Sequence, residues 1–258
     1  MIALDRISIE LTNQCSKACW FCYNASAPDR ATRWQPIEVI RLVRDCAGHG
    51  IKAVAFGGGE PLEYAGLWEV LTATRGRLFR SLTTNGLALD RELSGLVACA
   101  PDKVHVSIHF PGRRAEVTRA IRQVHELARA GIASGVNLVV RASQIEDAVG
   151  CGEALRASGI ANERITYLPM RGGDTPTPAQ LGRVAGGRAF QSMSCLTACR
   201  NSPRFAAISW DRYVAWCSYT RSRHPLERYD FAALQAALVG LGLVHCDTPR
   251  VTRSLPMV

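Results

Sequence analysis

Short runs of apolar and β-branched residues alternate with longer amphipathic stretches from Ile7 to Met170, and this alternation constrains the fold more than any other feature. Each short run has the length and composition of a β-strand, and each longer stretch repeats its apolar residues at helical spacing. Six strands are expected, beginning near Ile7, Lys52, Leu78, Lys103, Gly135 and Arg164. Five helices fit the gaps between them. Such a sheet is parallel, because parallel strands need long crossover connections.

Right-handed crossovers repeated in sequence order curl a parallel sheet toward a barrel. We therefore expect an α/β fold, a partial TIM-like (β/α)6 barrel over residues 1–172, with its chemistry at the carboxyl ends of the strands. Residues 173–190 are rich in Gly, Pro and Thr and are interpreted as a linker. Residues 191–258 are expected to form a small domain with a β-hairpin and a last helix from Phe231 to about Leu243.

Three cysteines follow the first strand on one loop, Cys15, Cys19 and Cys22, in a C-x3-C-x2-C spacing. No export signal is recognised at the start of the chain, so a cytoplasmic location is expected, where thiols stay reduced. Metal or redox chemistry then accounts for the ten cysteines better than disulfides do. Three thiolates on one loop can hold three irons of a cubane and leave the fourth open. A zinc knuckle or buried thiols are the alternatives.

The stretch LTNQCSKACWFC resembles the signature of the radical S-adenosylmethionine (radical SAM) superfamily, including the aromatic Phe21 before the last cysteine. The resemblance implies that Cys15, Cys19 and Cys22 bind a 4Fe-4S cluster and that S-adenosylmethionine chelates its open iron. It also implies that one electron cleaves this cofactor to a 5'-deoxyadenosyl radical, which takes hydrogen from a substrate. Phe21 would belong to the cofactor site.

Two strand ends resemble further motifs of this superfamily. Gly58, Gly59 and Glu60 end the second strand and resemble its GGE motif, whose backbone would meet the amino group of the cofactor. A tight strand-to-helix turn explains the same residues. Asn85, in a Thr-Asn-Gly sequence after the third strand, resembles another cofactor-binding turn, and a plain Asn-Gly turn explains it nearly as well.

The fourth and fifth strands carry the remaining cofactor candidates. Ser107 lies where the superfamily often has a polar contact, and Asn137 and Arg141 resemble positions that reach the ribose and the carboxylate. An arginine suits a carboxylate because its fork can bind two oxygens. Solvent-facing roles remain open for Ser107 and Arg141. His109 stands where many relatives carry aspartate, and it is either a general base or a structural histidine. No catalytic residue is assigned.

A second cysteine group lies in the last quarter of the chain: Cys195, Cys199, Cys217 and Cys246. It resembles the auxiliary-cluster region called SPASM or, in its short form, twitch, and implies a second 4Fe-4S cluster. A zinc site or packed thiols are the alternatives. The three other cysteines fall at apolar helical positions and are expected to be structural: Cys46, Cys99 and Cys151.

Three functions fit these observations. The first is a radical SAM enzyme that oxidises or epimerises a small natural product such as a sugar or aminocyclitol, with the auxiliary cluster accepting an electron. The second is a SPASM-type maturase of a ribosomally made peptide, and the third a zinc or tRNA-binding protein. The expected partners are the substrate and an electron donor such as flavodoxin or ferredoxin, with no membrane. Nucleic acid is disfavoured because the basic residues behind the net charge of +9 are spread along the chain.

Overall fold

The computed structural model describes residues 2–187 and 204–242. The strands are β1 Arg6–Thr12, β2 Ala53–Gly58, β3 Phe79–Thr84, β4 Lys103–Ile108, β5 Ala133–Val140, β6 Ile165–Pro169, β7 Phe205–Ile208, β8 Tyr213–Ala215 and β9 His224–Pro225. The α-helices are α1 Pro36–Gly48, α2 Leu67–Ala73, α3 Leu89–Cys99, α4 Arg114–Arg129, α5 Ile145–Ala157, α6 Pro178–Val184 and α8 Phe231–Leu238. Short 3-10 turns cover Pro61–Glu63, Ala142–Gln144 and Asn162–Arg164. No helix in the described ranges is long and apolar enough to span a membrane.

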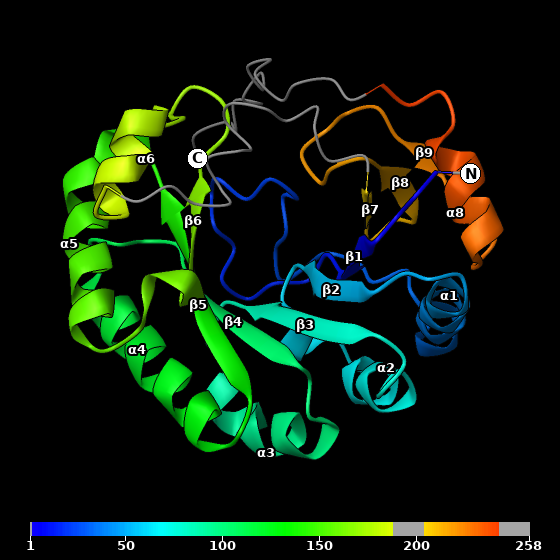
Figure 1. Cartoon of the computed structure of the whole chain (residues 1–258), viewed down its shortest axis with the longest axis horizontal. Coiled ribbons are helices and arrows are strands. Elements are labelled where there is room, and N and C mark those ends of the chain that lie inside the picture. Colours follow the sequence, from blue (N-terminus) through cyan, green and yellow to red (C-terminus); the bar gives the residue numbers. More distant parts are fainter. Residues whose placement is uncertain (1, 188–203, 243–258) are drawn as a thin grey trace.

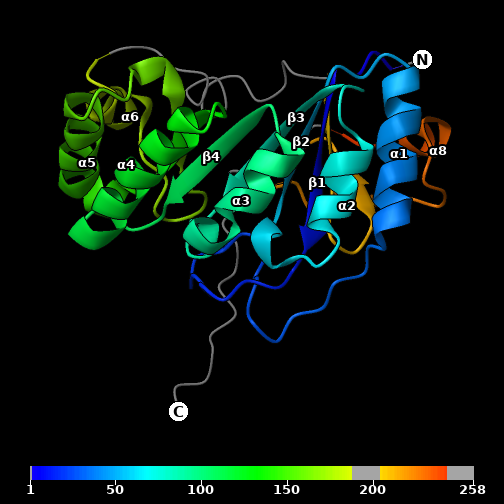
Figure 2. The ribbon, with the colours of Figure 1, turned by 90° about the horizontal axis from the view of Figure 1, so that it is seen from below.

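The strands form one nine-stranded sheet in the order β6-β5-β4-β3-β2-β1-β7-β8-β9. Strands β1 to β6 pair in sequence order, each parallel to the next. A helix fills each of the five connections, and these helices line the outer side of the curved sheet (Figure 1, Figure 2). The predicted parallel α/β fold with six strands and five helices is confirmed.

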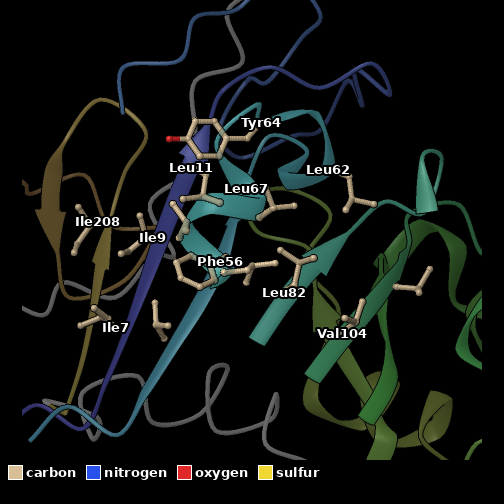
Figure 3. Close-up of a cluster of buried hydrophobic side chains, with 14 of the residues drawn as sticks. Ile7, Ile9, Leu11, Phe56, Leu62, Tyr64, Leu67, Leu82, Val104 and Ile208 are labelled. Carbon is tan, nitrogen blue, oxygen red and sulfur yellow. The ribbon is translucent and has the colours of Figure 1, made fainter. Parts of the chain in front are cut away.

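Alternate residues of each strand point to opposite faces of the sheet. Ile7, Ile9 and Leu11 of β1 are almost completely buried against the helices, together with Phe56 of β2 and Leu82 of β3 (Figure 3). The residues between them therefore face the concave inner side of the partial barrel. That inner side is polar, since it carries Ser8, Glu10, Ser81, Thr83, His105, Ser107 and Asn137.

The C-terminal hairpin continues the barrel sheet. Strand β7 lies parallel to β1, with Arg6 opposite Phe205 and Ile9 opposite Ile208, and β8 returns antiparallel to β7. The predicted hairpin is thus present, while the division into domains 1–172 and 191–258 stays a prediction. Helix α8 ends earlier than expected, because the extended backbone of Val239 and the left-handed Gly240 follow Leu238.

Helix α6 lies within residues 173–190, whose role as a linker stays a prediction. Thr177 caps this helix by accepting a hydrogen bond from the Gln180 amide at 3.2 Å, and the Gln180 side chain accepts one from the Thr177 amide at 2.8 Å. Leu181 and Val184 are completely buried beside α5. The signal was the sequence Thr-Pro-Ala-Gln, since threonine with glutamine three residues later is a capping box and proline suits the first helical turn.

Candidate active site

The three-cysteine loop follows β1 at the carboxyl edge of the sheet (Figure 2). Cys15 is buried, and Cys19 and Cys22 are half-buried. The loop turns tightly, because the Cys22 amide donates to the Cys19 carbonyl at 3.0 Å and Ala18 takes a left-handed backbone conformation. The Cys15 amide donates to the Ala27 carbonyl at 3.2 Å, which fixes the start of the loop.

Burial and neighbouring charges act on the thiols of the loop. The pKa of the Cys19 thiol is raised to about 11, first by burial and also by the nearby Cys15 and Cys22 thiols, against the Lys17 ammonium, which lowers it. Three thiolates here would repel one another unless a cationic centre held them. Iron-sulfur clusters take such thiolates, so this donor set fits a cluster.

A single metal ion and an iron-sulfur cubane demand different arrangements of thiolates. Across residues 2–187 and 204–242, no three histidine, cysteine or acidic side chains converge closely enough to hold one metal ion. A cubane makes a different demand, because each thiolate binds its own iron.

The glycine-rich end of β2 packs directly on the start of this loop. The Gly59 amide donates to the Thr12 carbonyl at 2.7 Å, and the Glu60 amide donates to the Gln14 carbonyl at 2.8 Å. A Cβ at Gly59 would lie 2.0 Å from the Gln14 carbonyl oxygen, so no larger residue fits. Both Gly59 and Gly58, which has a φ of +116°, are required by backbone packing.

The Glu60 carboxylate is buried and organises the neighbouring strand end. It accepts hydrogen bonds from the Leu62 amide at 3.1 Å, the Thr84 hydroxyl at 2.7 Å and the Asn85 amide at 2.7 Å. Burial raises the pKa of this carboxyl to about 7, although the three donors oppose the rise. Asn85 in turn directs its side-chain amide to the Cys15 sulfur at 3.6 Å. Glu60 and Asn85 therefore connect two strand ends to the cysteine loop.

Ser107 and Asn137 lie opposite each other in the pairing of β4 with β5. Both are buried on the inner face of the barrel. The Asn137 side-chain oxygen lies 2.7 Å from Nδ1 of His105. Burial, with help from the charges of Lys103 and Arg164, lowers the pKa of His105 to about 4, so this imidazole is neutral.

Arg141 follows β5 and covers the cysteine loop. Its Nε donates to Asp174 at 2.7 Å and its Nη1 to Gln144 at 3.1 Å, while the guanidinium lies 4.8 Å from the centre of the Trp20 ring. Two of its three nitrogens are therefore engaged within the protein. The predicted contact of Arg141 with a cofactor carboxylate remains a prediction.

Phe21 sits within an aromatic group at the mouth of the barrel. Its ring centre lies 5.2 Å from that of Trp20, 5.5 Å from that of Phe110 and 6.2 Å from that of His109. Trp20 is 71% exposed, so the group extends from the surface to the residues that follow the carboxyl end of β4.

Two glutamates that are distant in the sequence anchor the cysteine loop. Glu63 accepts hydrogen bonds from the Ser16 amide at 3.0 Å and from the Ser16 hydroxyl at 2.5 Å. Glu116 accepts one from the Lys17 ammonium at 2.7 Å. These glutamates lie 47 and 99 residues from their partners, so no local pattern marks them.

The buried carboxyl of Glu10 and the half-buried Tyr23 lie together beside the same loop. Tyr23 donates its hydroxyl to Glu10 at 3.0 Å, and its ring centre lies 4.9 Å from that of Tyr219. Burial raises the pKa of the Glu10 carboxyl, against the opposing charge of Arg223 and the Tyr23 hydrogen bond. The signal in the sequence was the alternation of β1, which directs Glu10 inward together with Ser8.

The remaining cysteines divide into two groups. Cys46, Cys99 and Cys151 are buried in α1, α3 and α5, as expected for structural thiols. Cys217 is half-buried just after β8, and its carbonyl accepts from the Thr220 amide at 3.1 Å. The other members of the predicted auxiliary site lie outside the described residues: Cys195, Cys199 and Cys246.

Comparison with known families decides the class of protein. The family model described as the radical SAM superfamily matches residues 9–174, which include the cysteine loop and all six parallel strands except the first residues of β1. The chain belongs to the radical SAM superfamily. Radical SAM enzymes use a 4Fe-4S cluster and S-adenosylmethionine, so these are the cofactors of this chain.

Three curated relatives are GTP 3',8-cyclases. The enzyme of Chlorobaculum tepidum is 33% identical over 108 residues, covering 41% of this chain and 33% of the relative. GTP 3',8-cyclase 2 of Mycobacterium tuberculosis is 35% identical over 145 residues (51% and 39%), and the Corynebacterium glutamicum enzyme is 30% identical over 194 residues (66% and 50%). The chain spans a third to a half of the length of these radical SAM relatives.

Solved radical SAM structures share the fold at low sequence identity. Streptococcus suis SuiB bound to S-adenosylmethionine superposes with a TM-score of 0.69 at 15% identity, covering 96% of this chain and 73% of SuiB. The structure of anSMEcpe with bound AdoMet gives a TM-score of 0.61 at 14% identity, covering 89% of this chain and 76% of that one. Both likenesses confirm the radical SAM fold expected from the alternation of strands and helices.

Proposed function

We propose that this radical SAM enzyme abstracts hydrogen from a small polar substrate inside the barrel and oxidises or epimerises it. The observation that carries this proposal is the buried Glu10 carboxylate on the inner face of β1, which accepts a hydrogen bond from Tyr23, whose ring packs on Tyr219 of the segment that carries Cys217. A carboxylate buried on a polar inner surface suits a ligand that offers hydroxyl or amino hydrogens.

Different residues of the chain are proposed to bind the cluster and to support its ligands. Cys15, Cys19 and Cys22 would ligate the 4Fe-4S cluster, which, with S-adenosylmethionine, supplies the adenosyl radical that removes hydrogen from carbon. Asn85 would hydrogen-bond the Cys15 sulfur, since its amide already lies 3.6 Å from it. Glu60 holds Asn85 in that place.

Ser107 and Asn137 present polar side chains to the inner surface and are proposed to contact S-adenosylmethionine, as are Phe21 and Arg141 at the mouth of the barrel. The backbone of Gly58, Gly59 and Glu60 is proposed to meet its amino group. This assignment follows the resemblance of these residues to the motifs of the superfamily.

Glu10 gives the site a means to accept a proton. Oxidation of an alcohol carbon removes one hydrogen atom from carbon, one proton from oxygen and one electron. The raised pKa of Glu10 brings this carboxylate closer to the range in which a general base works. The Tyr23 hydroxyl, whose pKa is raised by burial, stays protonated and holds the carboxylate in place.

Cys195, Cys199, Cys217 and Cys246 are proposed to hold a second 4Fe-4S cluster that accepts the released electron. The position of Cys217 supports this, because Tyr219 of the same segment packs on Tyr23 beside Glu10. A flavodoxin or ferredoxin is proposed as the donor of the first electron, and the cytoplasm as the location.

A purine nucleotide is the second candidate substrate, favoured by the name GTP 3',8-cyclase of the curated relatives. Both reactions begin with a hydrogen abstraction. They are distinguished by the substrate from which the hydrogen is taken. The likeness to SuiB concerns the fold alone and adds no argument for a peptide substrate.

The test is deuterium transfer in anaerobically reconstituted enzyme with dithionite and S-adenosylmethionine. Aminocyclitols and sugars deuterated at carbinol carbons, GTP, and short peptides are offered in parallel, and deuterium in 5'-deoxyadenosine is measured by mass spectrometry. We expect transfer from a carbinol carbon. Transfer from GTP alone would establish the second candidate, and transfer from peptides alone would contradict both.

Glu10→Gln tests the role of the carboxylate. We expect this variant to cleave S-adenosylmethionine without substrate as wild type does, and to lose about 100-fold in substrate oxidation, the low end of a general-base contribution. Glu163→Gln makes the same change at an exposed position and serves as the control. Equal turnover by the Glu10 variant and the control would remove Glu10 from the mechanism.

The second cluster is tested by iron and sulfide content. We expect about eight irons per chain in the wild type and about four when Cys15, Cys19 and Cys22 are all replaced by alanine. A wild type with about four irons, falling to none, would exclude the auxiliary cluster.

A further inference from the structure

Lys17, Glu116 and His109 meet at the mouth of the barrel and come from three separate parts of the chain. Lys17 lies in the cysteine loop, His109 follows β4 and Glu116 lies in the first turn of α4. The Lys17 side chain is 9% exposed and that of Glu116 is 7% exposed. This buried lysine-glutamate pair is part of neither the cofactor contacts nor the proton acceptor described above.

Each of the three residues contacts the other two through a hydrogen bond. The Lys17 ammonium donates to Glu116 Oε1 at 2.7 Å and reaches His109 Nδ1 at 3.0 Å. The His109 backbone amide donates to the same Glu116 oxygen at 2.7 Å. Glu116 lies near the N-terminus of α4, where the helix dipole favours a negative charge.

The chemistry of lysine decides the protonation of His109. An ammonium group has three hydrogens and no lone pair, so it can only donate. Nδ1 of His109 must therefore accept, and in a neutral imidazole the proton then resides on Nε2. Burial and the Lys17 charge lower the pKa of His109 to about 4, which agrees with a neutral ring.

Nε2 of His109 consequently carries a hydrogen whose position does not change near neutral pH. Among the described residues, no atom accepts a hydrogen bond from it, and the side chain is 23% exposed. The His109 ring lies beside Phe21, directly after the carboxyl end of β4. This N–H is thus available to an oxygen acceptor that enters the barrel.

We propose that Lys17, Glu116 and His109 form a clasp that positions the cluster-binding loop and fixes His109 as a neutral Nε2–H donor at the barrel mouth. The proposal rests on the assignment of Cys15, Cys19 and Cys22 as cluster ligands. Lys17 is the link, because it stands between Cys15 and Cys19 and its ammonium is held by α4 and by the residue after β4. Lys17 and Glu116 are positioning residues in this scheme.

The clasp gives the buried Lys17–Glu116 ion pair a role. Removing one partner of such a pair leaves an uncompensated buried charge, whereas removing both is much better tolerated. Lys17→Met therefore leaves the Glu116 carboxylate next to His109, whose Nδ1 lies 3.9 Å from Glu116 Oε1. The imidazole is then expected to take up a proton on Nδ1 and replace the lysine.

The first measurement is nitrogen-15 NMR of the histidines in the reconstituted enzyme, with His109→Asn identifying the His109 signals among the six histidines. We expect the Nε2–H tautomer in wild type from pH 8 to pH 5.5. Lys17→Arg should keep it, since arginine also only donates. Lys17→Met should instead show a proton on Nδ1. A wild-type Nδ1–H tautomer, or a Lys17→Met spectrum like wild type, would overturn the clasp.

The second measurement is the iron content of the three-cysteine site and its reduction potential by EPR titration. We expect Lys17→Met and the double variant Lys17→Met with Glu116→Gln both to lose iron, because neither has the ammonium that ties the cysteine loop to α4, while Lys17→Arg should retain it. Glu116→Gln alone should raise the potential, since a negative charge near the cluster is removed. Full iron content in Lys17→Met, or the same iron loss in Lys17→Arg as in Lys17→Met, would overturn the positioning role.

These measurements separate the clasp from the proposed reaction. Iron content, tautomer and potential are read without any substrate, so the clasp stands or falls whatever the enzyme oxidises. Conversely, a failed deuterium transfer in an enzyme with the expected His109 spectrum contradicts the proposed substrate class and leaves the clasp supported.

Discussion

Replacing Gly59 by alanine should separate the glycine-rich strand end from the cysteine loop. The new Cβ would lie 2.0 Å from the carbonyl oxygen and 2.7 Å from the carbonyl carbon of Gln14, and both are backbone atoms that cannot rotate away. The strand end must therefore move. The hydrogen bonds from the Gly59 amide to Thr12 and from the Glu60 amide to Gln14 then break.

The size of the effect follows from these two bonds. A buried donor left without a partner costs about 1–3 kcal/mol, so the free energy of unfolding should fall by about 2–4 kcal/mol. For a chain of this length the melting temperature should fall by about 5–15 °C. Thermal and urea unfolding of the anaerobic protein measure both quantities, and the variant should also retain less iron after reconstitution.

Gly57→Ala is the matched control for this experiment. A Cβ at Gly57 meets no atom within 4 Å, so this change should alter the free energy of unfolding by less than about 0.5 kcal/mol. Equal free energies of unfolding for the two alanine variants would show that the backbone tolerates a Cβ at Gly59.

Three further changes test other parts of the structure. Because burial raises the pKa of Glu60 from 4.5 to about 7, its contribution to stability is present below pH 4.5 and lost as the pH rises through 7, so the unfolding free energies of wild type and Glu60→Gln should diverge over that interval; parallel curves would contradict the shift. The folded pKa of His105 is lowered from 6.5 to about 4, so its contribution is present above pH 6.5 and lost as the pH falls through 4, and His105→Gln should reduce the acid sensitivity of urea unfolding. Arg80 is 2% exposed and donates to the carbonyls of Leu71 and Cys99, so Arg80→Met should cost about 3 kcal/mol in urea unfolding, and a cost below about 1 kcal/mol would show that water replaces those bonds.

The strands and most helices of the barrel were predictable because their information is local. The run from Ile7 alternates residues for two faces of a sheet, and the cysteine spacing after it marks a loop with metal chemistry. Helix α6 was missed because Gly, Pro and Thr outweighed the capping pattern at Thr177. The composition of that segment was ordinary for a linker, and only the burial of Leu181 and Val184 identifies it as packed structure.

The supports of the site were harder to predict, since each depends on contacts between distant residues. Nothing near Glu63 or Glu116 indicates that these carboxylates hold the cysteine loop. Arg141 looked suited to a carboxylate of a ligand, and the structure pairs it with Asp174 of the protein itself. A single sequence indicates which groups can do chemistry, whereas the partners that orient them follow from the tertiary fold.

The parallel pairing of β1 with β7 also bears on how the chain folds. Arg6 and Phe205 are neighbours in the sheet and about 200 positions apart in the chain, a contact of the kind that slows folding. During synthesis, one edge of β1 stays unpaired until the hairpin emerges from the ribosome, long after the other strands can assemble. The open edge of a strand such as β1 can pair with other chains and start aggregation. The yield of folded protein should therefore depend strongly on chaperones and on the temperature of expression.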